Sequence, residues 1–563
     1  MTASSRREML RLLRWAIFSC FVLTINSGPL GASTNERGVS RKGPVYVPLD
    51  SWIYPALRRL AAMGYAPDEE SLAAPWTRQQ CFTLVEEAAD IASQRSTKIS
   101  AGRVNEQALA LIAALRAEFA DGTAARPTLS LETIYTRYAQ ATGSPLRDSY
   151  HFGQTVTDDY GRPYDNGPNN ITGFSGYGTA GRFSGYLRGE YQYAGGRGPY
   201  SESVREFVAA ADGVPLQPAR RVGATSRFDP LEMYIGAQFG NFDITVGKQS
   251  FWWGPGEASA FHFSNNAEPM YAVRVAQDMP VLLPGPLRIL GRIRTQFVLG
   301  RLSGHQYPPR PFINAQKITF QLTQDFELGF TRSAIFGGVG HPLTAGSLFR
   351  SVFSISSSGG TSGANDAGDR RSGFDFRWHI PGLRRYVMIY SDSLADDNPS
   401  PLESPHRSAW GPGIYISHFP RLPKLDLRVE TYSTWLYRRD EGGRFIYWNN
   451  QYQDAYTNER SLLGSWVGRD ARAYAASSTY WWSAQNKITA SFRQTKIGGR
   501  FLPGGGTQTD VGLNLEWRVR PELLTNAFVQ YERYFVPVLG GAKRDVVAGM
   551  QLTFYPADWK IKR

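Results

Sequence analysis

Length, composition and charge exclude several classes of protein. The chain has 563 residues, 13% of them aromatic, with 57 glycines and a mean hydropathy of −0.35. It contains no run of about 18 apolar residues, which excludes an ordinary helical membrane protein. The net charge of +13 is spread along the chain rather than clustered as in a nucleic-acid-binding protein, so no nucleic acid partner is expected.

Residues 1–32 have the features of a secretory signal peptide. Four arginines precede an apolar run from Trp15 to Ile25, and small residues surround Ala32. Cleavage near Ala32 would remove four arginines and one glutamate, which lowers the net charge from +13 to about +10. It would also leave Cys81 as the only cysteine, so the mature chain is expected to contain no internal disulfide.

Residues 33–127 are predicted to form a helical bundle. Apolar residues recur at intervals of three and four in three stretches, at about 50–63, 76–93 and 104–119, which indicates three short amphipathic helices. Thr77 is placed to cap the second of them. Helices of this length and polarity form a small bundle and not a membrane anchor.

From residue 128 to residue 563 the chain is dominated by segments in which apolar and polar residues alternate. In one of them, Phe183, Leu187 and Tyr191 alternate with Arg188 and Glu190. Successive side chains of a strand point to opposite faces, so this pattern predicts a strand with one apolar and one polar face. The same pattern recurs at residues 424–432, 511–519 and 547–554.

Such repetition over roughly 400 residues is typical of a transmembrane antiparallel β-barrel with a polar lumen. A soluble β-sandwich explains any single segment equally well, but the number of segments favours the barrel. The expected fold class is therefore mainly β, with roughly 16 to 18 strands by pattern.

One alternating segment, residues 287–299, carries three arginines on its polar face, at Arg288, Arg292 and Arg294. If the segment is a barrel strand, these arginines face the lumen. They could hold a plug by ion pairs or line a pathway for anions, and plug support is the preferred interpretation.

Two motifs are rich in aromatic and amide side chains. Residues 246–269 read VGKQSFWWGPGEASAFHFSNNAEP and contain Trp252 and Trp253 before a G-P-G turn. A second segment contains Trp448, Asn449, Tyr452, Tyr456 and Asn458. Aromatic rings stack on the C–H faces of sugars while amides bind hydroxyls, so these seven residues are candidate glycan contacts. A purely structural role remains open, and for the two adjacent tryptophans it is preferred.

Together with the sequence VPLDSWIYPALRRLAAMGY at 47–65 and PWTR at 75–78, these motifs resemble the capsule assembly Wzi family across nearly the whole mature chain. The resemblance implies an outer-membrane barrel of about 18 strands at residues 128–563, plugged on the periplasmic side by the helical bundle of residues 33–127. It also implies a lectin-like role in attaching exported polysaccharide to the bacterial cell surface. The implied partners are capsular polysaccharide or exopolysaccharide, outer-membrane lipid and the polysaccharide export machinery.

The main alternative is a porin-like or substrate-specific outer-membrane channel that uses the arginine-bearing lumen. Enzymatic hypotheses are disfavoured, because the seven histidines are dispersed and no H-E-x-x-H or G-x-S-x-G motif occurs. A lipase or deacylase built on His262 and Ser264, which would share a strand face, is the remaining enzymatic hypothesis. No cofactor and no metal site are predicted.

Overall fold

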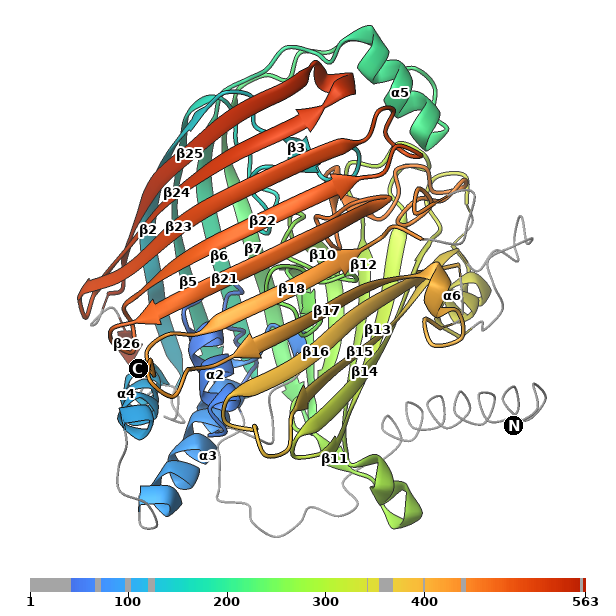
Figure 1. Ribbon diagram of the computed structural model, residues 1–563. Coiled ribbons are helices and arrows are strands. Elements are labelled where there is room, and N and C mark those ends of the chain that lie inside the picture. Colours follow the sequence, from blue (N-terminus) through green and yellow to red (C-terminus); the bar gives the residue numbers. More distant parts are fainter. Residues whose placement is uncertain are drawn as a thin grey trace.

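A computed structural model describes residues 42–65, 72–96, 103–119, 127–341, 343–353, 368–397, 400–436, 442–556 and 560–562. The predicted signal peptide lies outside these residues. Most of the described chain forms one closed antiparallel β-barrel, and three helices gather at one end of it (Figure 1).

Eighteen long strands form the barrel wall within the described residues. The first nine are β2 (Thr128–Thr142), β5 (Gly167–Ala180), β6 (Phe183–Ala194), β7 (Thr225–Phe239), β8 (Phe242–Gln249), β10 (Met270–Gln277), β12 (Arg292–Arg301), β13 (Phe312–Thr323) and β14 (Phe326–Phe336). The other nine are β15 (Asp369–His379), β16 (Val387–Asp396), β17 (Ser408–Ile416), β18 (Leu427–Ser433), β21 (Ala471–Trp481), β22 (Lys487–Ile497), β23 (Gly506–Arg520), β24 (Leu523–Val536) and β25 (Gly541–Phe554). Strand β2 closes the ring because it pairs with both β5 and β25, so the predicted fold class is confirmed.

The two ends of the barrel differ. At the end that carries the N-terminal helices, strands are joined by turns as short as residues 181–182, and two short strands, β11 (Val281–Leu282) and β26 (Lys560–Lys562), extend the wall. At the opposite end most connections are longer, and two of them contain the helices α5 (Glu202–Asp212) and α6 (Ala345–Phe353). We call these the helix end and the loop end.

Burial alternates along the strands as the sequence pattern predicts. On β6, Phe183 and Tyr191 are 58% and 45% exposed, whereas Arg188 and Glu190 are 4% and 0% exposed. Trp517 of β23 is likewise 49% exposed on the outer face. A closed barrel with an apolar exterior and a polar interior leaves no strand edge unpaired, which is the requirement for a sheet that spans a lipid membrane.

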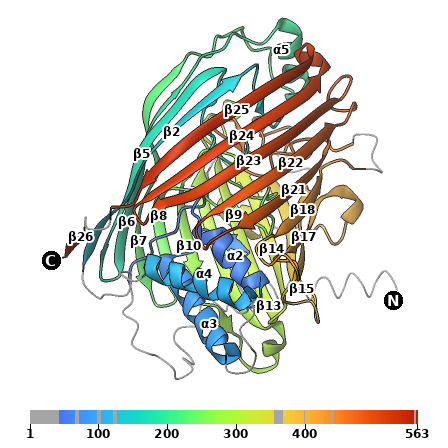
Figure 2. The same ribbon diagram turned by 60° about the vertical axis from the view of Figure 1, so that its left-hand side comes forward.

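The N-terminal helices are α2 (Ile53–Ala62), α3 (Arg78–Ser96) and α4 (Arg103–Phe119), and they lie together at the lower end of the barrel in Figure 2. Thr77 caps α3 as predicted, because its Oγ1 accepts the N–H of Gln80 at 3.1 Å while Gln80 Oε1 accepts the N–H of Thr77 at 2.9 Å. In the described parts of the chain, no helix combines the length and the apolar character that a bilayer crossing requires.

Several contacts fix these helices in the mouth of the barrel. The Arg59 side chain of α2 is fully buried, donates to the carbonyl of Pro423 at 3.0 Å and pairs with Asp426 at 3.3 Å. Gln80 of α3 donates to the carbonyl of Asp278 at 2.8 Å. Both carbonyls belong to connections at the helix end, so the helices are anchored to the rim of the wall.

Two hydrophobic clusters fill much of the lumen. The first consists of residues from the N-terminal helices and the segments beside them, together with Trp252, Ala260 and Trp481. The second, which we call the loop-end core, is built mainly from the connections 250–269 and 434–470 and includes Trp253 and Tyr456. A two-residue strand joins them, because β1 (Ala73–Ala74) pairs with β9 (Trp252–Trp253).

The strand predicted at residues 287–299 begins later than expected. Strand β12 starts at Arg292, whereas residues Gly285–Leu290 form the 3-10 helix η2. Gly291 follows η2 with φ of 69°, a conformation that favours glycine and that separates the helix from the strand. Arg288 therefore lies exposed in a connection at the helix end and does not face the lumen from a strand.

Candidate functional site

The first aromatic motif leaves β8 and folds into the lumen. Trp253 is 0% exposed, and its ring meets the edge of Phe263 at a centroid distance of 5.0 Å and an angle of 84°. Trp252 is 8% exposed, and its Nε1 donates to the carbonyl of Gly256 at 3.0 Å. Neighbouring residues cover both indole rings, which pack against the loop-end core and the N-terminal helices. Glycan contact by either ring stays a prediction.

Three residues of the second motif are buried in the same way. Tyr456 stacks almost parallel to Tyr447 at 5.8 Å. Asn458 accepts the N–H of Ser303 at 2.9 Å and donates to the carbonyl of Glu268 at 2.8 Å, so it joins three connections. Tyr452 is 1% exposed. These residues hold the loops in the lumen, and contact between any of them and a sugar stays a prediction.

Trp448 and Asn449 remain half-buried at the loop end. Trp448 Nε1 donates to the carbonyl of Asp212, the last residue of α5, at 3.0 Å. Asn449 Oδ1 accepts the N–H of Gln451 at 2.8 Å, while its Nδ2 donates to Asp369 at 3.1 Å. Each side chain is thus held by its polar edge while part of it stays open to solvent.

Other connections converge on this pair. Gln453 donates its backbone N–H to the carbonyl of Tyr307 at 2.9 Å and its side-chain amide to the carbonyl of Gly213 at 2.7 Å. Asp454 accepts the backbone N–H groups of Gln306 and Tyr307 at 2.6 and 2.5 Å. We call the resulting surface the loop face; it consists of Gln306, Tyr307, Trp448, Asn449, Asn450, Gln451, Gln453 and Asp454.

The chemistry of the loop face suits sugar hydroxyls. Three of its amides, those of Gln306, Asn450 and Gln451, belong to exposed residues, and each amide both donates and accepts hydrogen bonds. The half-buried rings of Tyr307 and Trp448 add apolar area with fixed orientation. The loop face therefore combines the two kinds of group that carbohydrate binding uses.

A buried charged cluster fixes α5 behind the loop face. Asp212 accepts from Arg469 at 2.9 Å and contacts His151 Nε2 at 2.9 Å, while His151 Nδ1 contacts Asp148 at 2.7 Å. Burial alone lowers the pKa of His151, but the carboxylates of Asp148 and Asp212 outweigh that effect and raise the pKa to about 10. His151 is therefore cationic at neutral pH and sets the position of the carbonyl that holds Trp448.

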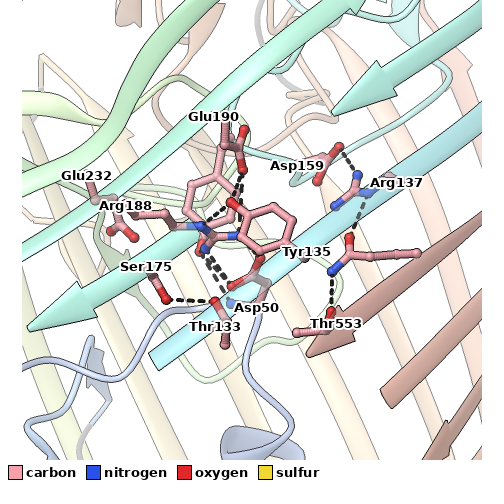
Figure 3. A network of polar contacts seen from close by, with 12 residues as sticks. Asp50, Thr133, Tyr135, Arg137, Asp159, Ser175, Arg188, Glu190, Glu232 and Thr553 are labelled. Carbon is pink, nitrogen blue, oxygen red and sulfur yellow. Dashed lines mark hydrogen bonds and ion pairs between the residues drawn. The ribbon is translucent and has the colours of Figure 1, made fainter. Parts of the chain in front are cut away.

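A second polar network joins the N-terminal segment to the wall inside the lumen (Figure 3). Arg188 of β6 donates to both oxygens of Asp50 at 2.9 and 2.7 Å, and its Nε donates to the hydroxyl of Tyr135 at 2.9 Å. The Tyr135 hydroxyl in turn donates to Glu190. Asp50 precedes α2, so this network fixes the start of the N-terminal helices against β2 and β6.

The same network reaches the connection 143–166, which enters the lumen from the loop end. Arg162 donates to both oxygens of Glu190, at 2.9 and 2.5 Å, and to Asp159 at 2.5 Å. Tyr160 lies 3.2 Å from the carboxylate of Asp50. Segments that enter from opposite ends therefore meet in the middle of the barrel.

Of the three arginines predicted to face the lumen, Arg294 does so. On β12 it lies on the inward face, which it shares with Gln296. Its guanidinium donates to the carbonyl of Asp278 at 3.2 Å, and the same carbonyl accepts a hydrogen bond from Gln80 of α3. Arg292 is exposed at the first position of the strand. Arg294 thus shares the carbonyl acceptor of Asp278 with helix α3.

The arrangement of His262 and Ser264 does not match a catalytic pair. Ser264 Oγ donates to the carbonyl of Gly464 at 2.7 Å, so its proton is not directed to His262.

Among the described residues, Asp369, Asp396 and Asp397 bring three carboxylates within 4.8 Å of one another. The Arg371 guanidinium lies 2.6 Å from Asp369 and 3.3 Å from Asp396, and it offsets their charge.

The sequence analysis missed most of the loop face. Gln453 and Asp454 directly follow the motif residue Tyr452, so the run W-N-N-Q-Y-Q-D contained a signal for them. Tyr307 lies 146 residues before Gln453 and carries no comparable signal, because only the folding of the loops brings the two together.

Comparison with known proteins places the chain in a family. The model of the capsule assembly protein Wzi family matches residues 137–545, which is more than half of the chain. A Klebsiella pneumoniae protein described as an uncharacterized 55.8 kDa protein in the cps region is 28% identical over 193 residues. That match covers 34% of this chain and 37% of the relative, so the chain spans little more than a third of that protein.

A solved structure shows the same fold. It is that of Wzi from Escherichia coli, described as an outer-membrane protein involved in group 1 capsule assembly and as a carbohydrate-binding β-barrel. The TM-score is 0.65 at 17% identity, and the match covers 91% of this chain and 99% of the other. With the closed barrel, the N-terminal helices and the match over residues 137–545 taken together, the chain belongs to the capsule assembly Wzi family.

Proposed function

We propose that this chain is a lectin-like protein of the bacterial outer membrane that binds capsular or other exported polysaccharide and helps to attach it to the cell surface. The loop face is the observation that carries this proposal, because it gathers amide and aromatic groups at the mouth of a filled barrel. Membership of the Wzi family and the carbohydrate binding described for the Escherichia coli protein support it.

In this proposal the helix end faces the periplasm and the loop end faces the outside of the cell. Barrels of this class have short periplasmic turns and longer external loops, and the turn at residues 181–182 contrasts with the connection at 434–470 in that sense. The N-terminal helices then act as a periplasmic plug. Residues 1–32 serve as the signal that directs the chain to this location.

The contents of the lumen favour binding over transport. Between the loop-end core and the N-terminal helices, β1 pairs with β9, and Asp50 contacts both Arg188 and Tyr160. A solute would have to break these buried contacts in order to pass. A porin-like channel, by contrast, keeps a water-filled lumen.

Replacing Trp448 with alanine is expected to weaken polysaccharide binding about ten-fold, because the indole supplies apolar area and orders the end of α5. The measurement is binding of purified capsular polysaccharide from the host strain to the detergent-solubilised protein. Trp410→Ala is the matched control, since its indole also donates to a backbone carbonyl, that of Pro405 at 2.8 Å, but lies outside the loop face.

The same assignment is tested in cells. A strain that lacks the protein should release more polymer into the medium and keep less on its surface, and Trp448→Ala should reproduce part of that defect. Unchanged cell-bound polymer in the deletion strain would refute the attachment role. Equal polysaccharide binding by Trp448→Ala and the unaltered protein would show that the loop face is not the binding site.

A further inference from the structure

The connection between β10 and β12 folds over the outside of the barrel wall at the helix end, where β11 marks it in Figure 1. On β12, Ile293 alternates with the inward-facing Arg294 and therefore points outward, yet it is 0% exposed. Its register partner on β13, Phe320, is buried as well. Leu283 of the connection belongs to the same apolar cluster as these two wall residues. The connection thus covers side chains that would otherwise face lipid, and we call its residues 279–291 the rim segment.

The 3-10 helix η2 of the rim segment turns one face to the wall. Side chains three residues apart eclipse one another in a 3-10 helix. Leu287 and Leu290 share a face in this way, and both pack against the apolar cluster. Arg288 and Ile289 lie between them and point elsewhere, so both are exposed. Among the described residues, Ile289 has the largest exposed fraction of any large apolar side chain, at 82%.

The rim segment combines apolar side chains with a single cation. Met279 and Leu282 are also exposed, and residues 279–291 contain one arginine, Arg288, and no acidic residue. Segments that lie in a membrane interface have this composition, because their apolar side chains enter the acyl region while their cations reach the head groups. A bilayer that covers the outer wall would end beside this segment and would bring lipid phosphate to Arg288.

We propose that the rim segment inserts into the lipid leaflet at the helix end, with Ile289 among the acyl chains and the Arg288 guanidinium on the phosphate of an anionic phospholipid. Lipid is the occupant that fits, because the apolar cluster beneath η2 continues onto outward residues of β14, Leu328 and Phe330, and so is continuous with the lipid-facing wall. The inference rests on the membrane location in the proposed function and is independent of polysaccharide binding.

The first measurement is the depth of position 289 in lipid nanodiscs, which leave both membrane faces open to solvent. Apart from the signal peptide, the chain has one cysteine, Cys81, and it is buried, so a bimane fluorophore can be attached selectively to Ile289→Cys. We expect strong quenching by a doxyl group on the lipid acyl chain and weak quenching by aqueous iodide. Ile235→Cys on the outward face of β7 is the lipid reference, and Leu109→Cys on α4 is the aqueous reference.

The second measurement is the preference for anionic lipid, read by native mass spectrometry of the detergent-purified full chain. We expect the unaltered protein to retain phosphatidylglycerol over phosphatidylcholine at least about five-fold, and R288Q to lose most of that preference. The preference should shrink as salt is raised. R220Q is the matched control, because Arg220 is also exposed but lies at the loop end, in the connection between β6 and β7.

Quenching of position 289 by iodide at the level of position 109 would overturn the proposal. So would a label shielded from both quenchers, which would indicate a protein partner such as a second copy of the chain, or an R288Q variant that keeps the unaltered lipid preference. All variants should retain polysaccharide binding, because the loop face lies at the opposite end of the barrel. Failure of the unaltered protein to bind polysaccharide would refute the proposed function and leave both lipid measurements unchanged.

Discussion

Replacing Glu190 with glutamine is expected to lower the free energy of unfolding by about 3 to 5 kcal/mol. Glu190 is fully buried, accepts hydrogen bonds from Nε and Nη2 of Arg162, and lies 3.8 Å from Arg188. Its loss leaves these two buried cations with Asp159 and Asp50 as the carboxylates to which they still donate hydrogen bonds. The measurement is the temperature at which the purified barrel unfolds in detergent.

Glu86→Gln is the control for this substitution. Glu86 also pairs with an arginine, Arg116 at 2.7 Å, but the two side chains are 42% and 47% exposed. Exposed pairs contribute less than about 1 kcal/mol, so this variant should unfold close to the unaltered protein. Equal effects of the two substitutions would show that the lumen network does not join the N-terminal segment to the wall as described.

Replacing Trp253 with alanine is expected to cost about 3 to 5 kcal/mol, because a fully buried indole leaves a cavity in the loop-end core. The connection 250–269 should become sensitive to protease, since its aromatic contacts with Phe251 and Phe263 are lost. Trp517→Ala, which removes a 49% exposed indole from the outer face, should leave that protease sensitivity unchanged.

The Trp253 variant also distinguishes packing from glycan contact. If Trp253 packs the core, polysaccharide binding falls only to the extent that the loops loosen. If the variant keeps its unfolding temperature and protease resistance but loses polysaccharide binding, the indole touches the glycan and its assignment to the core is incorrect.

The barrel could be predicted because strand pairing imposes a period of two that is visible in the chain itself. On β6, Arg188 points inward and the adjacent Leu187 points outward, so the polarity of each residue indicates which face of the sheet it occupies. The start of α3 could also be predicted from neighbouring residues, since Thr77 and Gln80 cap the helix within four residues. In both cases neighbours in sequence decide the outcome.

The candidate site could be predicted only in part, because distant contacts decide which aromatic residues stay exposed. Trp253 and Trp448 both sit in motifs rich in aromatic and polar residues, yet Trp253 is buried and Trp448 is half-exposed. The difference arises because β9 pairs with Ala73 and Ala74, about 180 residues earlier in the chain. Arg288 differs from the prediction for a local reason, because it belongs to η2 and the turn at Gly291 separates that helix from β12.

The central claim is that segments entering from both ends close the lumen of this barrel, and that the loop face binds polysaccharide. Ion conductance of the full-length protein in a planar lipid bilayer tests the closure most directly. The account predicts little or no steady current, because the helices, the loop-end core and the contacts of Asp50 occupy the lumen. A large and steady current would contradict it and would favour a channel.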